Sequence, residues 1–255
     1  MNRIAKKLFN LCGFDLIPRT RPIKDPIAAR GEFPSDFSDA EIETINRVRP
    51  FTMTSIERIV SAIRAVEYTV ANGIPGAIVE CGVWRGGSMM AIALTLLRLG
   101  KKDTPLYLFD TFEGMSKPTD VDGEVAATGW RDNQNSRNDL NTWCYASIED
   151  VRENLASTGY DPKMISFVKG KVEDTLPASA PESISLLRLD TDWYESTRHE
   201  LIHLFPRLNR SGVIIIDDYG YWEGCRRAVD EYMQTNRVQL LLSRIDLTGR
   251  IGVKL

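Results

Sequence analysis

The sequence predicts an α/β fold with a mostly parallel sheet, helices on both faces and an antiparallel hairpin at the C-terminal end. From Gly76 onward, short β-branched and leucine-rich runs alternate with helical segments, which is typical of parallel strands covered on both faces. The predicted strands are residues 76–81, 105–110, 164–168, 184–190 and 213–217, with helices near 87–99, 147–157, 195–204 and 223–235. Two further runs, 238–245 and 249–254, follow each other across a short turn and predict the hairpin.

Residues 1–50 are expected to form an N-terminal arm and helix, distinct from a domain that spans residues 51–255. Prolines and glycines without a clear period come first, SDAEIETINRV then predicts a helix, and a longer helix is predicted from Ser55 to Asn72. The N-terminus is basic and then briefly apolar, but no small-residue cleavage site follows it. We therefore favour an arm packed on the domain or on a second subunit over a signal peptide, and leave weak peripheral membrane contact open.

The composition is ordinary for a soluble globular enzyme, with 43% hydrophobic and 26% charged residues in a chain of 255. A net charge of −3 leaves no basic surplus to neutralise phosphates, which argues against a nucleic-acid partner. No apolar run approaches the roughly 18 residues that indicate a membrane span. The four cysteines lack C-x-x-C spacing, so they predict reduced thiols in a cytoplasmic protein.

Residues 111–146 interrupt the alternation, because they contain no convincing strand and become strongly polar at 130–142. A connection of this length inside a compact domain is usually a functional lid or a locally disordered segment. We therefore predict a lid-like insertion near 113–146 and expect it to bear on the choice of substrate.

The turn after the first predicted strand carries the pattern E-x-G-x-x-x-G, formed by Glu80, Gly82 and Gly86. Glycines let the backbone approach a ligand closely, and Ser88 opens the next helix, whose N-terminal amides suit a carboxylate. The pattern differs from the dinucleotide-binding G-x-G-x-x-G and is typical of S-adenosylmethionine sites. On so short a match, a tight strand-to-helix turn without a ligand is the alternative.

Asp110 ends the second predicted strand, where a carboxylate can accept hydrogen bonds from both hydroxyls of a ribose. The alternative, a helix or turn cap, is the weaker interpretation at that position. The third strand is followed by GKVED at 170–174, where an adenine ring would be held. Thr111, Val172 and Glu173 therefore join Asp110 in the predicted cofactor site.

Two predicted strand ends carry an unusual density of acids: Asp190 and Asp192 follow one, and Asp217 and Asp218 follow the other. If these strands are parallel neighbours, the four carboxylates converge on one edge of the sheet. A hard dication such as Mg²⁺ would relieve their repulsion. We assign Asp190, Asp217 and Asp218 to the cation and Asp192 to the general base that deprotonates the acceptor. The alternative is that one or two of these acids only cap helices or line solvent.

A competing motif is HELIH at 199–203, which matches the zinc-protease pattern H-E-x-x-H, with Glu223 at a plausible distance for a third ligand. The intervening chain contains Pro206, a glycine-containing turn and a buried strand instead of the helix that should present that glutamate. A zinc protease would also leave the glycine pattern and the paired aspartates unexplained. We treat His199 and His203 as residues of a helix surface.

These segments resemble the macrocin O-methyltransferase family, whose members methylate sugar hydroxyls of antibiotics, over about residues 51–254. The resemblance is carried by FTMTSIERI, IVECGVWRGGS, LYLFDTFEGM, FVKGKVEDTLP, LLRLDTDWYEST, GVIIIDDYGYWEGCRRAVDEY and RIDLTGRIGVKL. It implies the Rossmann-like class I methyltransferase fold, a homodimer or higher homo-oligomer, S-adenosylmethionine and Mg²⁺. It also implies cofactor contacts at Met53, Ser55, Glu80, Gly82, Ser88, Asp110 and Glu173. For the cation it implies Asp190, Asp217 and Asp218, and for the base it implies Asp192, which are the residues assigned above from their expected repulsion.

The sequence thus predicts an S-adenosylmethionine-dependent O-methyltransferase that acts on a sugar hydroxyl of a glycoside or glycan, with Mg²⁺ chelating a diol of the acceptor. A catechol-type acceptor presents a similar pair of oxygens and is the alternative within the enzyme class. Outside that class, the chain could be a non-catalytic module that binds S-adenosylmethionine. The four acids and the glycine turn argue against such a module. The expected partner is a small-molecule or glycan acceptor.

Overall fold

The computed structural model describes residues 33–133 and 142–255. The chain divides into two compact units, Met1–Asp39 and Ala40–Leu255, and the second contains the whole sheet. Most of the predicted N-terminal arm and the most polar part of the predicted lid lie outside the described residues. The functional division near residue 50 and the closing of a lid stay predictions.

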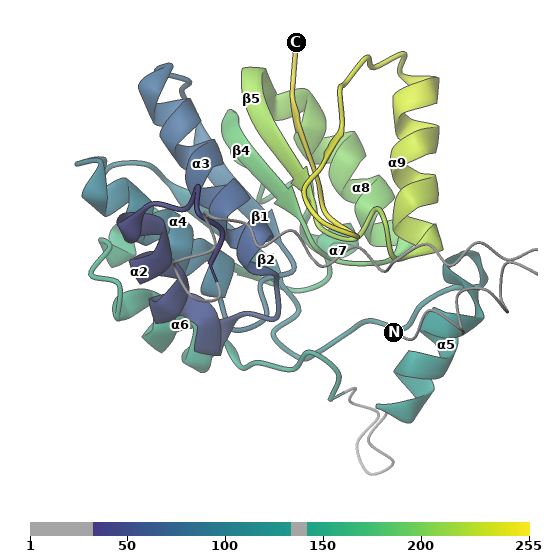
Figure 1. The fold of residues 1–255 in the computed structure, drawn as a ribbon. Helices are drawn as coiled ribbons and strands as arrows, with labels where there is room; N and C mark the ends of the chain where they lie inside the picture. The colour runs from purple at the N-terminus through teal and green to yellow at the C-terminus, as the bar shows by residue number, and fades with distance from the viewer. Residues whose placement is uncertain (1–32, 134–141) are drawn as a thin grey trace, which may run out of the picture. The chain divides into compact units, whose positions relative to one another are not determined.

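Seven strands of the described chain form one sheet in the order β3-β2-β1-β4-β5-β7-β6 (Figure 1). They are β1 Ala77–Cys81, β2 Leu106–Asp110, β3 Ile165–Lys169, β4 Ile184–Leu189, β5 Leu208–Ile216, β6 Ser243–Arg244 and β7 Arg250–Val253. Strands β1 to β5 are parallel, and β7 pairs antiparallel with β5 and β6. The order reverses between β1 and β4, which places a ligand crevice at the carboxyl ends of these two strands. The predicted fold class is confirmed.

Helices cover both faces of the sheet (Figure 1): α3, α4 and α6 pack together on one side, and α7, α8 and α9 pack together on the other. The α-helices are α2 Asp39–Val48, α3 Ile56–Ala71, α4 Gly87–Arg98, α5 Gly123–Asp132, α6 Ile148–Ala156, α7 Val172–Thr175, α8 Tyr194–Leu204 and α9 Glu223–Thr235. Short 3₁₀ turns lie at Arg49–Phe51, Asp120–Asp122, Pro162–Met164 and Phe205–Arg207.

The centre of the sheet forms the core that positions the site. Every residue of β1 and β4 is buried, as expected for parallel strands with helices on both faces. Each fully buried leucine or isoleucine there stabilises the fold by about 1.5–3 kcal/mol relative to an exposed side chain. The helix α3 begins where the sequence predicts, because the Ser55 side chain accepts a hydrogen bond from the Arg58 amide at 3.2 Å. The burial of β1 and β4 therefore supports the carboxyl ends of these two strands, where the site lies.

Two parts differ from the sequence prediction. The first strand of the hairpin is only Ser243–Arg244, and Leu241 within the apolar run before it is 82% exposed. Val238, Leu240 and Leu242 of that run pack against the core, but the run makes no strand pairing before Ser243. The prediction of a strand over 238–245 is therefore wrong except for its last part. In addition, α5 forms at Gly123–Asp132, inside the segment 111–146, where no helix was predicted.

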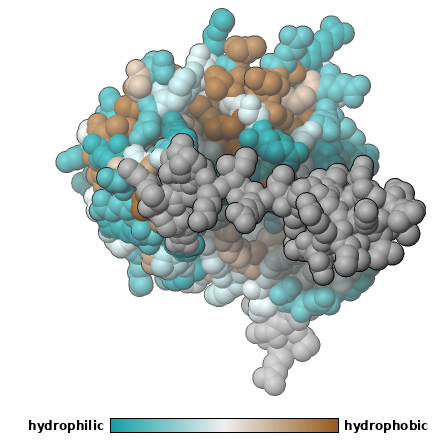
Figure 2. All heavy atoms as spheres, viewed as in Figure 1, coloured by the Kyte–Doolittle hydropathy of each residue, from teal (hydrophilic) through white to brown (hydrophobic). Residues whose placement is uncertain are grey.

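Hydrophobic residues gather on the upper part of the surface shown in Figure 2. Exposed large hydrophobic side chains of the C-terminal segment include Leu241, Val253 and Leu255, and the chain ends in this region of the view in Figure 1. Within the described ranges, no helix combines the length and the apolar character that crossing a membrane requires.

Candidate functional site

The glycine turn between β1 and α4 lies at the centre of the candidate site. Gly82 and Gly86 adopt left-handed φ angles of 80° and 85°, which residues with a Cβ rarely adopt. A Cβ added at Gly82 would also collide with the backbone carbonyl of Asp190, because β1 and β4 are neighbours here. Ser88 lies in the first turn of α4, at the end of the helix that suits an anion. The absence of a Cβ at Gly82 lets this turn lie close to the Asp190 backbone, and it also lets a ligand approach the turn.

Asp110, at the end of β2, holds this turn in place. Its Oδ2 accepts hydrogen bonds from the amides of Val83 and Trp84 at 2.6 and 3.1 Å, and its Oδ1 accepts one from the Phe112 amide at 2.7 Å. Burial raises the pKa of Asp110, and these three bonds counteract the effect. The turn-capping role that the sequence offered as the alternative is therefore present. Asp110 also faces the cavities beside the turn.

Two adjoining cavities open beside the glycine turn. The smaller, of about 70 Å³, is lined among the predicted cofactor residues by Thr111, Val172 and Glu173. The larger, of about 270 Å³, is lined by Met53 and Ser88 and by all four predicted acids. Gly82, Asp110 and Asp190 line both. The structure therefore brings most of the predicted cofactor residues to one crevice next to the acids.

Three predicted cofactor residues, Ser55, Glu80 and Gly86, do not line these cavities. Glu80 is buried beneath the turn, where its Oε1 accepts a hydrogen bond from Arg188 at 2.5 Å. Burial raises the pKa of Glu80 to about 7, although Arg188 acts to lower it. Ser55 caps α3, and its Oγ donates a hydrogen bond to Asp246 Oδ2 at 2.7 Å. Their positions suit a supporting role for the site.

Asp190, Asp192 and Asp218 form the acid cluster of the site. One ligand oxygen from each lies within 4.8 Å of the others, and no other group of three His, Cys, Asp or Glu side chains in the described part of the chain meets this criterion. Burial raises the pKa of all three carboxyls, that of Asp192 to about 7. A cluster of this kind is costly when fully ionised, and a dication would offset the repulsion. The donor set therefore fits a divalent cation.

Asp217, the fourth predicted acid, is held by two arginines. Its Oδ1 accepts a hydrogen bond from Arg188 Nη2 at 2.5 Å, and its Oδ2 accepts from Arg58 Nη1 and from Thr54 Oγ1, the latter at 3.3 Å. Both carboxylate oxygens thus already have donors, two of them charged. The structure brings three of the four predicted acids together, and the fourth is held by Arg58, Thr54 and Arg188, the last of which also contacts Asp190.

Arg188 joins the ends of three strands through one buried guanidinium. Its Nη1 donates to Glu80 Oε1 and, at 2.7 Å, to Asp190 Oδ2, while its Nη2 donates to Asp217. Sequence reasoning did not single out this residue. A usable signal was present, because an arginine inside the apolar strand LLRL requires buried acids nearby. Arg58, the second partner of Asp217, comes from α3 and gave no comparable signal.

Backbone strain is concentrated at the larger cavity. Asp192, Trp84 and Cys144 line it and adopt positive φ angles of 69°, 45° and 53°. Such conformations cost on the order of 1–3 kcal/mol for residues other than glycine, and they persist where the surroundings impose them. The position of the Asp192 carboxyl depends on this geometry, since it sets the direction in which the side chain leaves the loop.

An aromatic wall stands beside the acid cluster. Trp143, Trp193 and Trp222 pack edge to face, with ring centroids 5.1 to 6.0 Å apart. Tyr221 packs edge-on against Trp222 at 4.6 Å and is 58% exposed. Trp143, Tyr221 and Trp222 line the larger cavity. A ring-shaped acceptor can pack against such a wall while a few polar groups fix its orientation.

The H-E-x-x-H segment lies on α8, and its glutamate is directed into the core. Glu200 is fully buried and accepts a hydrogen bond from Thr191 Oγ1 at 2.8 Å. His199 Nε2 lies 3.3 Å from the Leu176 carbonyl oxygen. Among the residues that the structure describes, no third ligand gathers with the two histidines. Glu200 is therefore directed toward the loop that carries Asp190 and Asp192.

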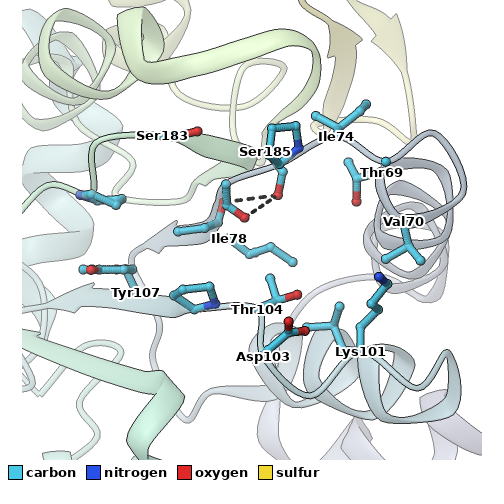
Figure 3. Close-up of a pocket in the computed structure, with 17 residues that line it drawn as sticks. Thr69, Val70, Ile74, Ile78, Lys101, Asp103, Thr104, Tyr107, Ser183 and Ser185 are labelled. Carbon is cyan, nitrogen blue, oxygen red and sulfur yellow. Dashed lines mark hydrogen bonds between the residues drawn. The ribbon is translucent and has the colours of Figure 1, made fainter.

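A larger cavity, of about 460 Å³, opens at the opposite edge of the sheet (Figure 3). The segments that lead into β1 and β2 form its walls, and Lys101 and Asp103 are among its residues. The Ser185 hydroxyl is turned to the carbonyl oxygens of Gly76 and Ala77, both at 3.2 Å. Sheets of this type bind ligands at the carboxyl ends of their strands. We therefore place the functional site at the two adjoining cavities beside the glycine turn, where the acids lie, although their volume is smaller.

Comparisons with known proteins point to one family. A family model described as macrocin-O-methyltransferase (TylF) matches residues 42–251. The 8-demethyl-8-(2,3-dimethoxy-alpha-L-rhamnosyl)-tetracenomycin-C 4'-O-methyltransferase of Streptomyces olivaceus is 34% identical over 215 residues, 83% of this chain and 79% of that protein. The mycinamicin III 3''-O-methyltransferase of Micromonospora griseorubida is 33% identical over 198 residues, 78% of this chain and 76% of that protein. The solved structure of the O-methyltransferase NovP is similar with a TM-score of 0.70 at 32% identity, covering 80% of this chain and 82% of that chain.

Proposed function

Because this chain belongs to the macrocin O-methyltransferase family, we propose that it methylates a sugar hydroxyl of a glycoside or glycan with the help of a divalent cation. The chain is an S-adenosylmethionine-dependent O-methyltransferase. One relative is named for a rhamnosyl group, which supports a sugar acceptor. The observation that carries the proposal is the position of the acid cluster, Asp190, Asp192 and Asp218, directly beside the glycine-turn cavities.

For the cofactor, we propose that the two adjoining cavities hold one S-adenosylmethionine. The adenine ring would lie in the smaller cavity beside Val172 and Glu173, with the ribose near Asp110. The methionine end would then lie over Gly82, with its carboxylate toward Ser88 and the first turn of α4. This placement directs the sulfonium methyl toward the acid cluster, because Asp190 lines both cavities.

The proposed reaction is a direct displacement. An acceptor oxygen attacks the methyl carbon, the carbon–sulfur bond breaks, and the acceptor proton passes to Asp192, leaving a methyl ether and S-adenosylhomocysteine. A divalent cation bound there would lower the pKa of the acceptor hydroxyl. Asp190 and Asp218 supply two ligand oxygens. The aromatic wall orients the acceptor ring.

The third carboxylate ligand has two candidates. Asp217 is the candidate from the sequence, and it would have to leave its contacts with Arg58 and Arg188 to reach a cation. Asp192 is the candidate from the geometry, because its oxygen already lies with those of Asp190 and Asp218. We propose Asp217 as ligand and Asp192 as base, and treat the exchange of these two roles as the alternative that experiment decides.

The two role assignments differ in what asparagine substitutions do. With Asp217 as ligand, Asp217→Asn weakens the binding of Mn²⁺, measured by calorimetry as a substitute for Mg²⁺, whereas Asp192→Asn binds Mn²⁺ but loses turnover. The reverse pattern establishes the exchanged roles. Both variants should still bind S-adenosylhomocysteine, which controls for folding. Turnover that persists unchanged in a chelator would contradict the requirement for a cation.

The acceptor class is tested by incubating the enzyme with methyl-labelled cofactor and a panel of rhamnosides, other glycosides and catechols. We expect label in a glycoside, with the new ether located on the sugar by NMR. Methylation of catechols alone would establish the catechol-type alternative. Calorimetry separates the remaining possibility: binding of S-adenosylhomocysteine without transfer to any acceptor would favour the non-catalytic module.

We also propose that the protein is a cytoplasmic homo-oligomer. The exposed C-terminal leucines Leu241 and Leu255 support self-association, since contiguous exposed apolar surface favours contacts between chains. Sedimentation equilibrium measures the molecular mass in solution. A mass equal to that of one chain of 28.8 kDa at all concentrations would contradict self-association.

A further inference from the structure

Glu200 is a buried acid that the proposed reaction does not use. It lies in the middle of α8, with 0% of its surface exposed. Helix α8 packs against β4 and α9, so the carboxyl is enclosed where this helix meets the sheet. Carboxyl groups are seldom buried this completely unless a specific contact keeps them in place. The contact that Glu200 makes therefore indicates its role.

The contact is with the loop that carries the acid cluster. Thr191 Oγ1 donates a hydrogen bond to Glu200 Oε1 at 2.8 Å, and Thr191 lies between Asp190 and Asp192. The Thr191 carbonyl oxygen in turn accepts hydrogen bonds from the Trp193 amide at 2.8 Å and from Ser196 Oγ at 3.3 Å. The threonine between the two acids is therefore attached to α8 through both its side chain and its backbone.

The loop needs such an attachment because its backbone is strained. Asp192 adopts a positive φ of 69°, which is unfavourable for any residue with a Cβ. A strained conformation persists only where neighbouring contacts impose it. If Thr191 were free, the loop could relax and the Asp192 carboxyl would turn away from Asp190 and Asp218. The side-chain bond to Glu200 acts directly next to the strained residue.

The same carboxyl also lies against the glycine turn. The Cys81 thiol, at the end of β1, is buried, and after burial itself the neighbouring Glu200 is the next cause that raises its pKa. Burial raises the pKa of Glu200 well above its usual value, which favours the neutral acid. Apart from the Cys81 thiol, no donor among the described residues faces its Oε2. A neutral side chain of this shape can be replaced by glutamine without a change of charge.

We propose that Glu200 is a positioning residue that fixes the Asp190–Asp192 loop through Thr191, so that the acid cluster is arranged for a cation before one binds. This inference rests on the cation site proposed above. In this role, the glutamate of the H-E-x-x-H segment holds the acid loop by accepting the hydrogen bond from Thr191. Partners of this kind, one step removed from the ligands, typically change metal affinity by 10–100-fold.

The test compares three substitutions by Mn²⁺ calorimetry. Glu200→Gln keeps the acceptor for Thr191 and should bind Mn²⁺ as the unmodified protein does. Glu200→Leu removes the acceptor and Thr191→Val removes the donor, so each should weaken Mn²⁺ binding about tenfold or more. The double variant should be no weaker than either single variant, because both remove one interaction. Glu195→Leu, an exposed position on the same helix, is the matched control and should change nothing.

Hydrogen exchange gives a second measurement that does not depend on a cation. In Glu200→Leu, the amides of residues 191–194 should exchange faster than in the unmodified protein, while β1 and β4 remain protected. Unchanged exchange together with unchanged Mn²⁺ affinity would overturn the inference, as would a Gln variant that behaves like the Leu variant. A wild-type protein that binds S-adenosylhomocysteine but no Mn²⁺ contradicts the proposed cation site alone, and hydrogen exchange then decides the role of Glu200.

Discussion

The guanidinium of Arg188 lies inside the apolar core and donates hydrogen bonds to three carboxylates of the site. Removing one partner of a buried ion pair costs about 3–5 kcal/mol, because the remaining charges lose their compensation. We therefore expect Arg188→Met to lower the free energy of unfolding by about that amount, measured by urea denaturation. Arg98→Met removes the exposed pair with Glu67 and should cost less than about 1 kcal/mol. Equal losses in the two variants would contradict this view of the core.

Asp246 provides a pH-dependent contribution to stability. Its burial favours the neutral acid, but hydrogen bonds from Ser55 and from the amides of Gly249 and Thr248, together with Arg58, lower its pKa to about 2. Its carboxylate therefore stabilises the fold above the unfolded-state pKa of about 3.9, and this contribution is lost as the pH falls toward 2. Allowing for solvent screening, we expect Asp246→Asn to cost about 1–2 kcal/mol at pH 6. The difference should shrink as denaturation is repeated down to pH 3, and a difference independent of pH would contradict the assignment.

At the scale of elements, the sequence predicted those whose hydrophobic pattern reflects their burial. The fully buried β1 and β4 and the capped helix α3 lie within a residue or two of their predicted bounds. The apolar run before β6 predicted a strand that does not form there, and its leucines remain partly or largely exposed. Helix α5 was missed because two glycines and several polar residues hide its period, and because contacts with distant residues hold it. Gly129, for example, lies against the ring of Trp143.

Asp122 is the anchor of the α5 insertion. Its Oδ1 accepts a hydrogen bond from the first amide of α8, that of Tyr194, at 2.7 Å, and its Oδ2 accepts from the Thr119 amide at 2.8 Å. Each bond to a buried charged group contributes about 1.5–3 kcal/mol. We expect Asp122→Ala to raise the rate of trypsin cleavage after Arg131 at least about tenfold, because the segment opens more often. The exposed neighbour Asp120 provides the control: Asp120→Ala should cleave at the original rate, and similar rates in both variants would rule out the anchor.

At the scale of the whole molecule, topology accounts for the part of the site that the sequence predicted. Parallel strands end at one edge, so acids that follow β4 and β5 had to approach the glycine turn that follows β1. Topology does not determine which carboxylates face one another. That depends on the backbone angle of Asp192 and on Arg58, which lies 159 residues before Asp217 in the chain. No local pattern in the sequence records a pairing over such a separation.

Ligand binding at this edge should stabilise the entire domain, because the crevice joins the central strands of the single sheet. At a concentration 100 times its Kd, S-adenosylhomocysteine would add about 2.7 kcal/mol, which corresponds to a rise in Tm of about 5–10 °C. We expect Gly82→Ala to abolish this rise, since the added Cβ would meet the Asp190 backbone. Gly159→Ala is the matched control, with a φ of +82° against +80° at Gly82 and nothing within 4 Å of the added Cβ.

Both variants carry the cost of a left-handed alanine, about 1–2 kcal/mol, so both should melt below the unmodified protein. Only Gly159→Ala should recover the full rise in Tm when S-adenosylhomocysteine is added, as followed by differential scanning fluorimetry. A Gly82→Ala protein that gains the same rise would show that the ligand does not approach this turn. The cofactor would then have to lie elsewhere on the sheet, and the acid cluster would lose its proposed methyl donor.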